Sequence, residues 1–264
     1  MSAPVLDGAG AAATAPARFV AHVMGTAVSL ALRGRHTGDG AARDAWAAVV
    51  ADLRRADALF SPWRANSLVS RIGRGELAPA DAGPEMAEVL AIGAAAARGS
   101  GGAFTLHPRG RFDPCGVVKG WAVERACTHL RALDDTGWCL AAGGDLQARA
   151  ADDGEPWRIG IEDPAATGRI VATVPVVDGA VATSGSAHRG AHVVDGRTGA
   201  TPSGIAQVSV LDASLTRADV DATAAFALGE DGVEWLAHRA GRTALVVRSD
   251  GAALTVRGPD PADG

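Results

Sequence analysis

The order of helix-like and strand-like segments constrains this chain more than any other feature. Short apolar runs, each closed by Gly, Asp or Pro, predict strands at residues 138–142, 157–161, 170–176, 180–183, 191–194 and 205–211. Segments with helical spacing predict helices at residues 40–59, 84–98, 117–133, 215–228 and 230–240. Because helices and strands do not alternate regularly, we expect an α+β fold, with a mostly antiparallel sheet and packed helices, rather than a doubly wound one.

The two ends of the chain complete the predicted organisation. Alternating β-compatible residues predict one strand over 18–33, and a closing hairpin is expected from 243–248 and 252–256. The first residues are rich in alanine and proline, which is typical of a disordered segment. With no internal repeat and no long linker, we expect a disordered lead-in, a single domain and a loose tail, at residues 1–17, 18–257 and 258–264.

Composition bounds the class of protein. Hydrophobic residues make up 47% of the 264 positions and charged residues 21%, an ordinary balance for a globular protein with a sizeable core. The net charge of −5 argues against nucleic-acid binding, which needs a basic face. The first 18 residues lack the basic start and apolar run of a secretory signal, so we expect none, and no apolar run reaches the ~18 residues of a membrane-spanning helix. We therefore expect no membrane insertion. Because the three cysteines form no CxxC pair, we also expect a reduced, cytoplasmic location.

The clearest chemical signal is the pair Asp219 and Thr223, four residues apart in a segment with helical spacing. Residues at this spacing share one face of a helix. A carboxylate and a hydroxyl offer the hard oxygen ligands that Mg²⁺ prefers. Considered alone, the pair is better explained by an acidic residue near a helix N-terminus and a packed threonine.

Lys119 is the only lysine of the chain, and it follows Asp113-Pro114-Cys115-Gly116. A glycine-containing turn that leads into a helix exposes backbone N–H groups that can bind phosphate. We expect Lys119 in the first turn, where a cation is unfavourable unless an anion neutralises it. The alternative, a solvent-exposed lysine, is weaker because every other fixed cation of the chain is an arginine.

Other stretches carry weaker signals. Gly143-Gly144-Asp145 follows an apolar run and is explained equally well by a tight turn with a capping aspartate. The small residues Thr183-Ser184-Gly185, followed by residues 192–199, could let a ligand approach the backbone. The alternative is a pair of turns with a hydrogen-bonded histidine. Met24 and Trp63 are either clamps for a flat ligand or packed side chains.

Several familiar motifs are absent from the sequence. It contains no G-x-G-x-x-G at a strand–helix junction and no Walker G-x-x-x-x-G-K-[ST]. It also contains no H-E-x-x-H and no G-x-S-x-G. Zinc-hydrolase, P-loop and α/β-hydrolase functions therefore have no support.

In their order along the chain, these stretches resemble the bacterial FAD:protein FMN transferase family, often called the ApbE family. The resemblance covers about residues 19–248 and is carried by Met24-Gly25-Thr26, Asn66-Ser67, Gly101-Gly102-Ala103-Phe104, Asp113 through Gly120, Gly143-Gly144-Asp145, Thr183-Ser184-Gly185, His192 through Gly199 and Ala218 through Thr223. Each motif is weak alone, but their fixed order makes the combination specific. The resemblance implies an ApbE-like fold of the T-fold type.

The resemblance also implies roles for individual residues. Mg²⁺ would be held by Asp219, Thr223 and the backbone carbonyl of Gly116. The FAD site would be lined by Met24, Trp63, Ala103, Phe104, Asp113, Lys119 and Val193. Lys119 and His192 would act in catalysis, with His192 near the pyrophosphate as a proton acceptor or an orienting group.

The implied reaction moves the FMN part of FAD onto a Thr or Ser hydroxyl of an acceptor protein, with Mg²⁺ required and AMP released. One alternative is an FAD hydrolase, in which water takes the place of the acceptor and FAD is split into FMN and AMP. Another is a flavin-binding protein without chemistry, which would not need the metal ligands. A purely structural role leaves the ordered motifs unexplained.

Four departures from the family pattern concern the flavin side of the site. Thr105 stands where the family usually has Asp, and the segment between Phe104 and Asp113 is shorter than usual. Gly196 stands where Pro is normal. Ser186-Ala187-His188 replaces a more common acidic-aromatic stretch. These departures affect the flavin contacts more than the metal ligands.

Overall fold

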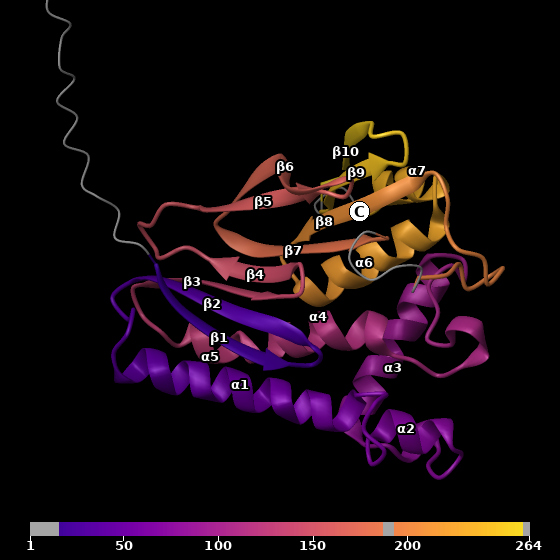
Figure 1. Cartoon of the computed structure of the whole chain (residues 1–264), viewed down its shortest axis with the longest axis horizontal. Helices are drawn as coiled ribbons and strands as arrows, with labels where there is room; N and C mark the ends of the chain where they lie inside the picture. Colours follow the sequence, from indigo (N-terminus) through magenta and orange to yellow (C-terminus); the bar gives the residue numbers. More distant parts are fainter. Residues whose placement is uncertain (1–15, 187–192, 261–264) are drawn as a thin grey trace, which may run out of the picture.

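The computed structural model describes residues 16–186 and 193–260. Its centre is an eight-stranded sheet in which every pair of neighbouring strands is antiparallel (Figure 1). In spatial order, its strands are β1 (Ala17–Val23), β2 (Thr26–Gly34), β3 (Thr136–Ala142), β4 (Asp145–Arg149), β7 (Asp178–Gly185), β8 (Ile205–Asp212), β9 (Thr243–Arg248) and β10 (Ala253–Arg257). The α+β fold with a mostly antiparallel sheet is thereby confirmed.

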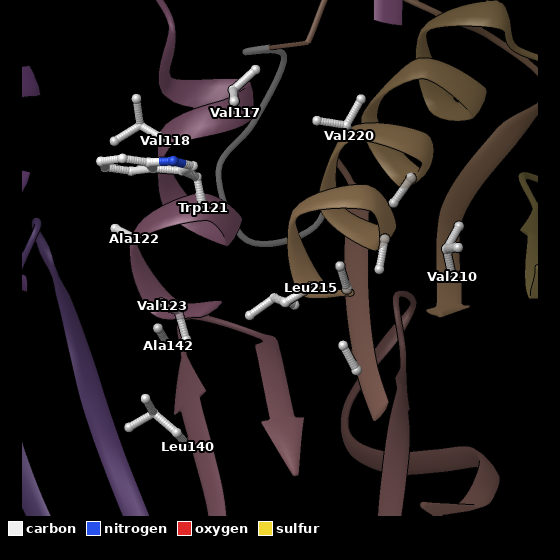
Figure 2. Packing of buried hydrophobic residues seen from close by; sticks show 14 of the residues in the cluster. Val117, Val118, Trp121, Ala122, Val123, Leu140, Ala142, Val210, Leu215 and Val220 are labelled. Carbon is white, nitrogen blue, oxygen red and sulfur yellow. The ribbon is translucent and has the colours of Figure 1, made fainter. Parts of the chain in front are cut away.

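Helices pack against one face of this sheet and bury the main core. They are α1 (Gly40–Phe60), α2 (Leu68–Gly73), α3 (Pro84–Gly99), α4 (Cys115–Ala126), α5 (Thr128–Arg131), α6 (Leu215–Leu228) and α7 (Asp231–Ala237), with single 3₁₀ turns η1 (Pro79–Asp81) and η2 (Pro108–Gly110). Figure 2 shows Val117 of α4 opposite Val220 of α6, whereas Trp121 projects from α4 on the side away from α6; all three belong to the same apolar cluster. Among the described residues, no helix combines the length and apolarity needed to cross a bilayer.

A two-stranded ribbon, β5 (Trp157–Asp163) and β6 (Ala166–Val176), lies on the other face of the sheet. It buries a second, smaller apolar cluster formed by Ala148, Trp157, Val176 and Val181. Gln207 of β8 donates its side-chain amide to the carbonyl of Glu162, 3.0 Å away, which ties the ribbon to the sheet. The central sheet is therefore covered on both faces, by helices on one and by the ribbon on the other.

Sequence-based expectations were wrong at three strands. The single strand expected over 18–33 is a hairpin, because Met24 and Gly25 adopt φ values of +55° and +70°, which turn the chain tightly. Strand β4 was not expected, because its sequence DLQAR has little apolar character. Val193 and Val194 lie in no strand, and the other residues of the strand expected over 191–194 are outside the described residues.

Helix boundaries were predicted better. The expected helix over 40–59 is α1, which begins where the Asp39 carboxylate accepts a hydrogen bond from the Ala42 N–H at 2.9 Å. The single helix expected over 117–133 is divided at Cys127 into α4 and α5. Because α4 begins at Cys115, Lys119 lies in its second turn and not, as expected, in its first.

Candidate functional site

A pocket of about 340 Å³ opens where α4 and α6 meet the ends of β7 and β8, the β3–β4 turn and strand β5. This volume falls in the range of small-molecule sites, about 300–1,000 Å³. Most of the residues predicted for the site line it, namely Ala103, Phe104, Asp113, Gly116, Lys119, Val193, Asp219 and Thr223. The structure therefore brings together residues that are up to 120 positions apart in the sequence.

Gly120 lets α4 and α6 approach closely enough to form the floor of this pocket. A Cβ atom at Gly120 would lie 2.8 Å from the Cβ of Asp219 and 2.9 Å from the Leu215 carbonyl oxygen. The Gly120 N–H donates a hydrogen bond to Asp219 Oδ2 at 2.9 Å. The absence of a side chain at Gly120 thus allows the Asp219 carboxylate of α6 to contact the backbone of α4.

Three charged groups meet at the pocket floor. Lys119 forms an ion pair with Asp145, and its Nζ lies 3.6 Å from Asp219 Oδ1. Asp219 is only 2% exposed. Burial raises the pKa of the Asp219 carboxyl to about 7, while the Lys119 ammonium opposes this shift and the Asp145 carboxylate adds to it.

Oxygen groups surround this charge cluster. Thr223, one turn after Asp219 on α6, exchanges a hydrogen bond of 3.1 Å with the hydroxyl of Ser184 on β7. Gly116 lies between Phe104 and Thr223, since a Cβ there would be 3.3 Å from the Phe104 ring and 3.8 Å from Thr223 Cγ2. Within the described residues, no three His, Cys, Asp or Glu side chains form a metal cluster. A cation here would therefore rely on hydroxyl, carbonyl and water oxygens as well as Asp219.

The entrance to α4 is shaped by Asp113. Its Oδ1 accepts a hydrogen bond from the Cys115 N–H at 3.0 Å, which forms an Asx-type turn directly before the helix. Its own N–H donates to the Leu106 carbonyl at 2.8 Å, which holds the loop before α4 in place. Asp113 thus lines the pocket and also fixes the backbone that leads to Gly116.

Two of the departures from the family pattern turn out to be neighbours. A Cβ at Gly196 would lie 2.8 Å from the Cβ of Thr105 and 2.5 Å from the Gly102 carbonyl oxygen. The Gly196 N–H donates to the Ala103 carbonyl at 2.9 Å, a hydrogen bond that proline cannot make. Glycine at 196 therefore lets the segment that carries Val193 pack directly against the pocket wall at Ala103 and Thr105.

Some predicted site residues lie elsewhere or are not described. Met24 sits in the β1–β2 turn and packs against the main core, and it does not line the pocket. Trp63 lies in the loop after α1 with 93% of its surface exposed, also outside the pocket lining. His192 lies outside the described residues. The ligand contacts assigned to these three side chains stay predictions.

Other residues at the pocket were not singled out as ligand or catalytic residues from the sequence. Asp145 was explained as a turn residue, yet it is 0% exposed and paired with Lys119. Residues 159–162 of β5 and Gln207 of β8 line the pocket directly, whereas Asp145 lies behind Lys119. No local pattern could identify them, because they reach the site only through the packing of the ribbon on the sheet. For Asp145, its place directly after the Gly143–Gly144 turn was the available signal.

Comparison with known proteins places this geometry in a family. The family model described as "ApbE family" matches residues 24–109 and 105–247. The FAD:protein FMN transferase of Haemophilus influenzae is 28% identical over 161 residues, which cover 56% of this chain and 46% of that protein. The protein of the same name from Vibrio cholerae is 32% identical over 126 residues, which cover 44% and 38%. The chain thus spans less than half the length of these curated relatives.

Solved structures share the fold. The ApbE protein of Thermotoga maritima superposes with a TM-score of 0.78 at 21% identity, covering 91% of this chain and 97% of that one. The Pseudomonas stutzeri flavinyl transferase ApbE, in its apo form, gives a TM-score of 0.75 at 24% identity, covering 91% and 95%. Since the family model extends across most of the sequence and the folds agree, this chain belongs to the ApbE family.

Proposed function

We propose that this protein is an FAD:protein FMN transferase, which moves the FMN part of FAD onto a Thr or Ser hydroxyl of an acceptor protein and releases AMP. The observation that carries the proposal is the pocket itself, in which a buried carboxylate, two hydroxyls and the only lysine of the chain converge. The names of the curated relatives support a flavin-transfer reaction. The requirement for Mg²⁺, the hydroxyl acceptor and the release of AMP are part of what we propose.

The donor set suits magnesium. Asp219, Thr223 and the backbone carbonyl of Gly116 would hold the ion, and all three residues line the pocket. Magnesium prefers oxygen ligands and keeps several waters, so one carboxylate with neutral oxygens is a fitting set. When bound, the ion would neutralise the charge of the FAD pyrophosphate and of the departing phosphate.

The chain's own residues would then position the substrate and handle the proton. The Lys119 side chain is 19% exposed and lines the pocket, so its ammonium could contact a phosphate oxygen. The acceptor hydroxyl oxygen forms a bond to the FMN-side phosphorus, and the bond from this phosphorus to the bridging oxygen breaks, so AMP departs with the electron pair. The hydroxyl proton would go to His192 or to water. Gly143 and Gly144 line the pocket without side chains, which leaves room for the substrate.

Incubation of the protein with FAD, Mg²⁺ and candidate acceptor proteins tests the proposal. Mass spectrometry of the acceptor should show the added mass of FMN, with an equal amount of AMP in solution. AMP and free FMN with no modified acceptor would identify an FAD hydrolase instead. If FAD binds tightly but no AMP is formed with any acceptor, the protein binds flavin without catalysing the transfer.

The cytosolic location stays a prediction, which fractionation of the native host cells checks.

A further inference from the structure

Asp145 joins the sheet to the pocket floor through a single buried carboxylate. It is the first residue of β4, and its side chain is fully buried. Oδ1 accepts a hydrogen bond from the Thr183 N–H of β7 at 3.0 Å, and Oδ2 forms the ion pair with Lys119 Nζ. Asp145 does not itself line the pocket, so its effect on a ligand would pass through its two partners that do, Lys119 and Thr183.

The ammonium of Lys119 lies between two buried carboxylates. Asp145 is in contact with it, while Asp219 Oδ1 is 3.6 Å away. A buried charge needs a partner, and a lysine side chain is flexible enough to choose between two. Without the negative charge of Asp145, we expect the ammonium to move onto Asp219, because that is the other carboxylate within reach.

We propose that Asp145 is a positioning residue, which holds the Lys119 ammonium away from Asp219 and at the place where a phosphate of FAD binds. The inference rests on the function proposed above. It assigns Asp145 two tasks, since the carboxylate both fixes the lysine and leaves Asp219 oriented by the Gly120 N–H. Outer partners of this kind typically change ligand or metal affinity by about 10–100-fold when they are removed.

The competing explanation is that Asp145 only completes the hydrogen bonding of β7. Asp145→Asn separates the two roles. The amide oxygen can still accept from the Thr183 N–H, whereas the amide NH₂ faces the Lys119 ammonium without a charge to attract it. A residue that merely completes the sheet would therefore tolerate this substitution, and a positioning residue would not.

The experiment measures FAD affinity in EDTA, where no metal-dependent turnover occurs, by the change in flavin fluorescence. The proteins are the full chain, Asp145→Asn, Lys119→Met and the double variant. Asp178→Asn is the matched control, because it removes a charge from an exposed ion pair with Arg131. We expect Asp145→Asn and Lys119→Met each to weaken binding by about tenfold or more, the loss of one charge-assisted contact. The double variant should be no weaker than Lys119→Met alone.

Thermal unfolding of the same proteins gives a second readout that does not depend on FAD. Lys119→Met leaves the Asp145 carboxylate buried without a cation, so the melting temperature of this variant should fall. Adding Asp145→Asn should restore part of the lost melting temperature. FAD binding by Asp145→Asn equal to that of the full chain, or no recovery in the double variant, would overturn the positioning role. If the unmodified chain itself binds no FAD, the proposed function fails first, and this inference falls with it.

Discussion

Asp219 shows how one side chain can serve both the fold and the site. Its carboxylate lines the pocket, yet it is buried and accepts a hydrogen bond from the backbone of α4. Asp221, two residues further, points to a different environment, where it pairs with Arg239 and Arg242. Both aspartates are therefore structural, and Asp221 cannot serve as a silent control for Asp219.

Asp219→Asn should reduce Mg²⁺-dependent AMP release from FAD by at least about a hundredfold, because the one carboxylate that would hold the metal ion loses its charge. The amide keeps the shape and can still accept from the Gly120 N–H, so the protein should remain folded. AMP release by chromatography and a thermal melt of each variant check this. Asp231→Asn, at an exposed position of α7, is the control, and full activity of Asp219→Asn would remove this residue from the metal site.

Gly196→Ala should destabilise the protein by about 1–3 kcal/mol, because the added Cβ meets Thr105 and the Gly102 carbonyl. Gly196→Pro should be worse, because it also removes the hydrogen bond to Ala103. Urea unfolding measures both effects. Gly40→Ala provides the comparison, since a Cβ there meets no other atom within 4 Å, and it should be neutral. Equal stability of Gly196→Ala and the unmodified chain would contradict the close packing.

At the scale of elements, the pairing of α4 with α6 decides the geometry of the site. Ala is intrinsically a better helix former than Gly by about 1 kcal/mol. Gly120→Ala should nevertheless lower the free energy of unfolding by about 1–3 kcal/mol, since the new Cβ clashes with Asp219 Cβ and a backbone carbonyl. It should also impair AMP release, because the two helices must separate.

The matched control for Gly120→Ala is Gly73→Ala in α2, where no atom lies within 4 Å of the added Cβ. This variant should keep or slightly raise the urea midpoint. If Gly120→Ala proves as stable and as active as Gly73→Ala, the close helix approach is not required for the site.

A second link between elements involves His36, which lies between β2 and α1. Its Nδ1 is 2.7 Å from Asp39 and its Nε2 is 2.8 Å from Asp134, in the loop before β3. Hydrogen bonds to Asp39 and then Asp134 raise the pKa of His36 above its usual value of 6.5. A raised pKa of a histidine means that the folded state binds the proton more tightly. The resulting stabilisation is fully present below about pH 6.5 and is lost as the pH rises through the folded pKa.

We therefore expect the urea midpoint of the protein to fall between about pH 6 and pH 9 by more than that of His36→Gln. Unfolding curves at several pH values compare the two proteins directly. His238→Gln, which changes a histidine bonded only to the Glu234 carbonyl in the described structure, should retain the pH dependence of the unmodified chain. Identical pH dependence in His36→Gln would exclude His36 as its source.

At the scale of the whole molecule, the pocket is a junction between sequence-distant segments. Its lining runs from Ala103 to Ala227 and includes the helical layer, the sheet and the ribbon. A ligand bound here contacts elements that come apart together on unfolding. Binding should therefore stabilise the entire fold and not one segment.

FAD at a hundred times its dissociation constant should stabilise the fold by about 2.7 kcal/mol, a rise in melting temperature of about 5–10 °C. Differential scanning fluorimetry at a wavelength free of flavin emission, or calorimetry, measures this shift. Riboflavin, which has the ring system but no phosphate, is the control and should produce a smaller shift. Equal shifts with both ligands would show that the pocket does not recognise the pyrophosphate.

The fold class, most helices and the motif residues could be predicted from the amino-acid sequence alone. The spacing of Ala45, Val49 and Leu53 specifies the buried stripe of α1 because a helix has a fixed period. The spacing of Asp219 and Thr223 places them on one helix face for the same reason. Such patterns depend on the geometry of a single element, so they are legible without the rest of the molecule.

Which of these residues meet could not be predicted in this way, because it depends on how the elements pack. The ion pair of Lys119 with Asp145, the contact of Thr105 with Gly196, and the position of Met24 and Trp63 away from the pocket all depend on how separate elements dock. Docking is governed by close packing across the whole core, where one missing Cβ at Gly120 sets the distance between two helices. No local pattern encodes that distance, because it is a property of the assembled layers and not of either helix.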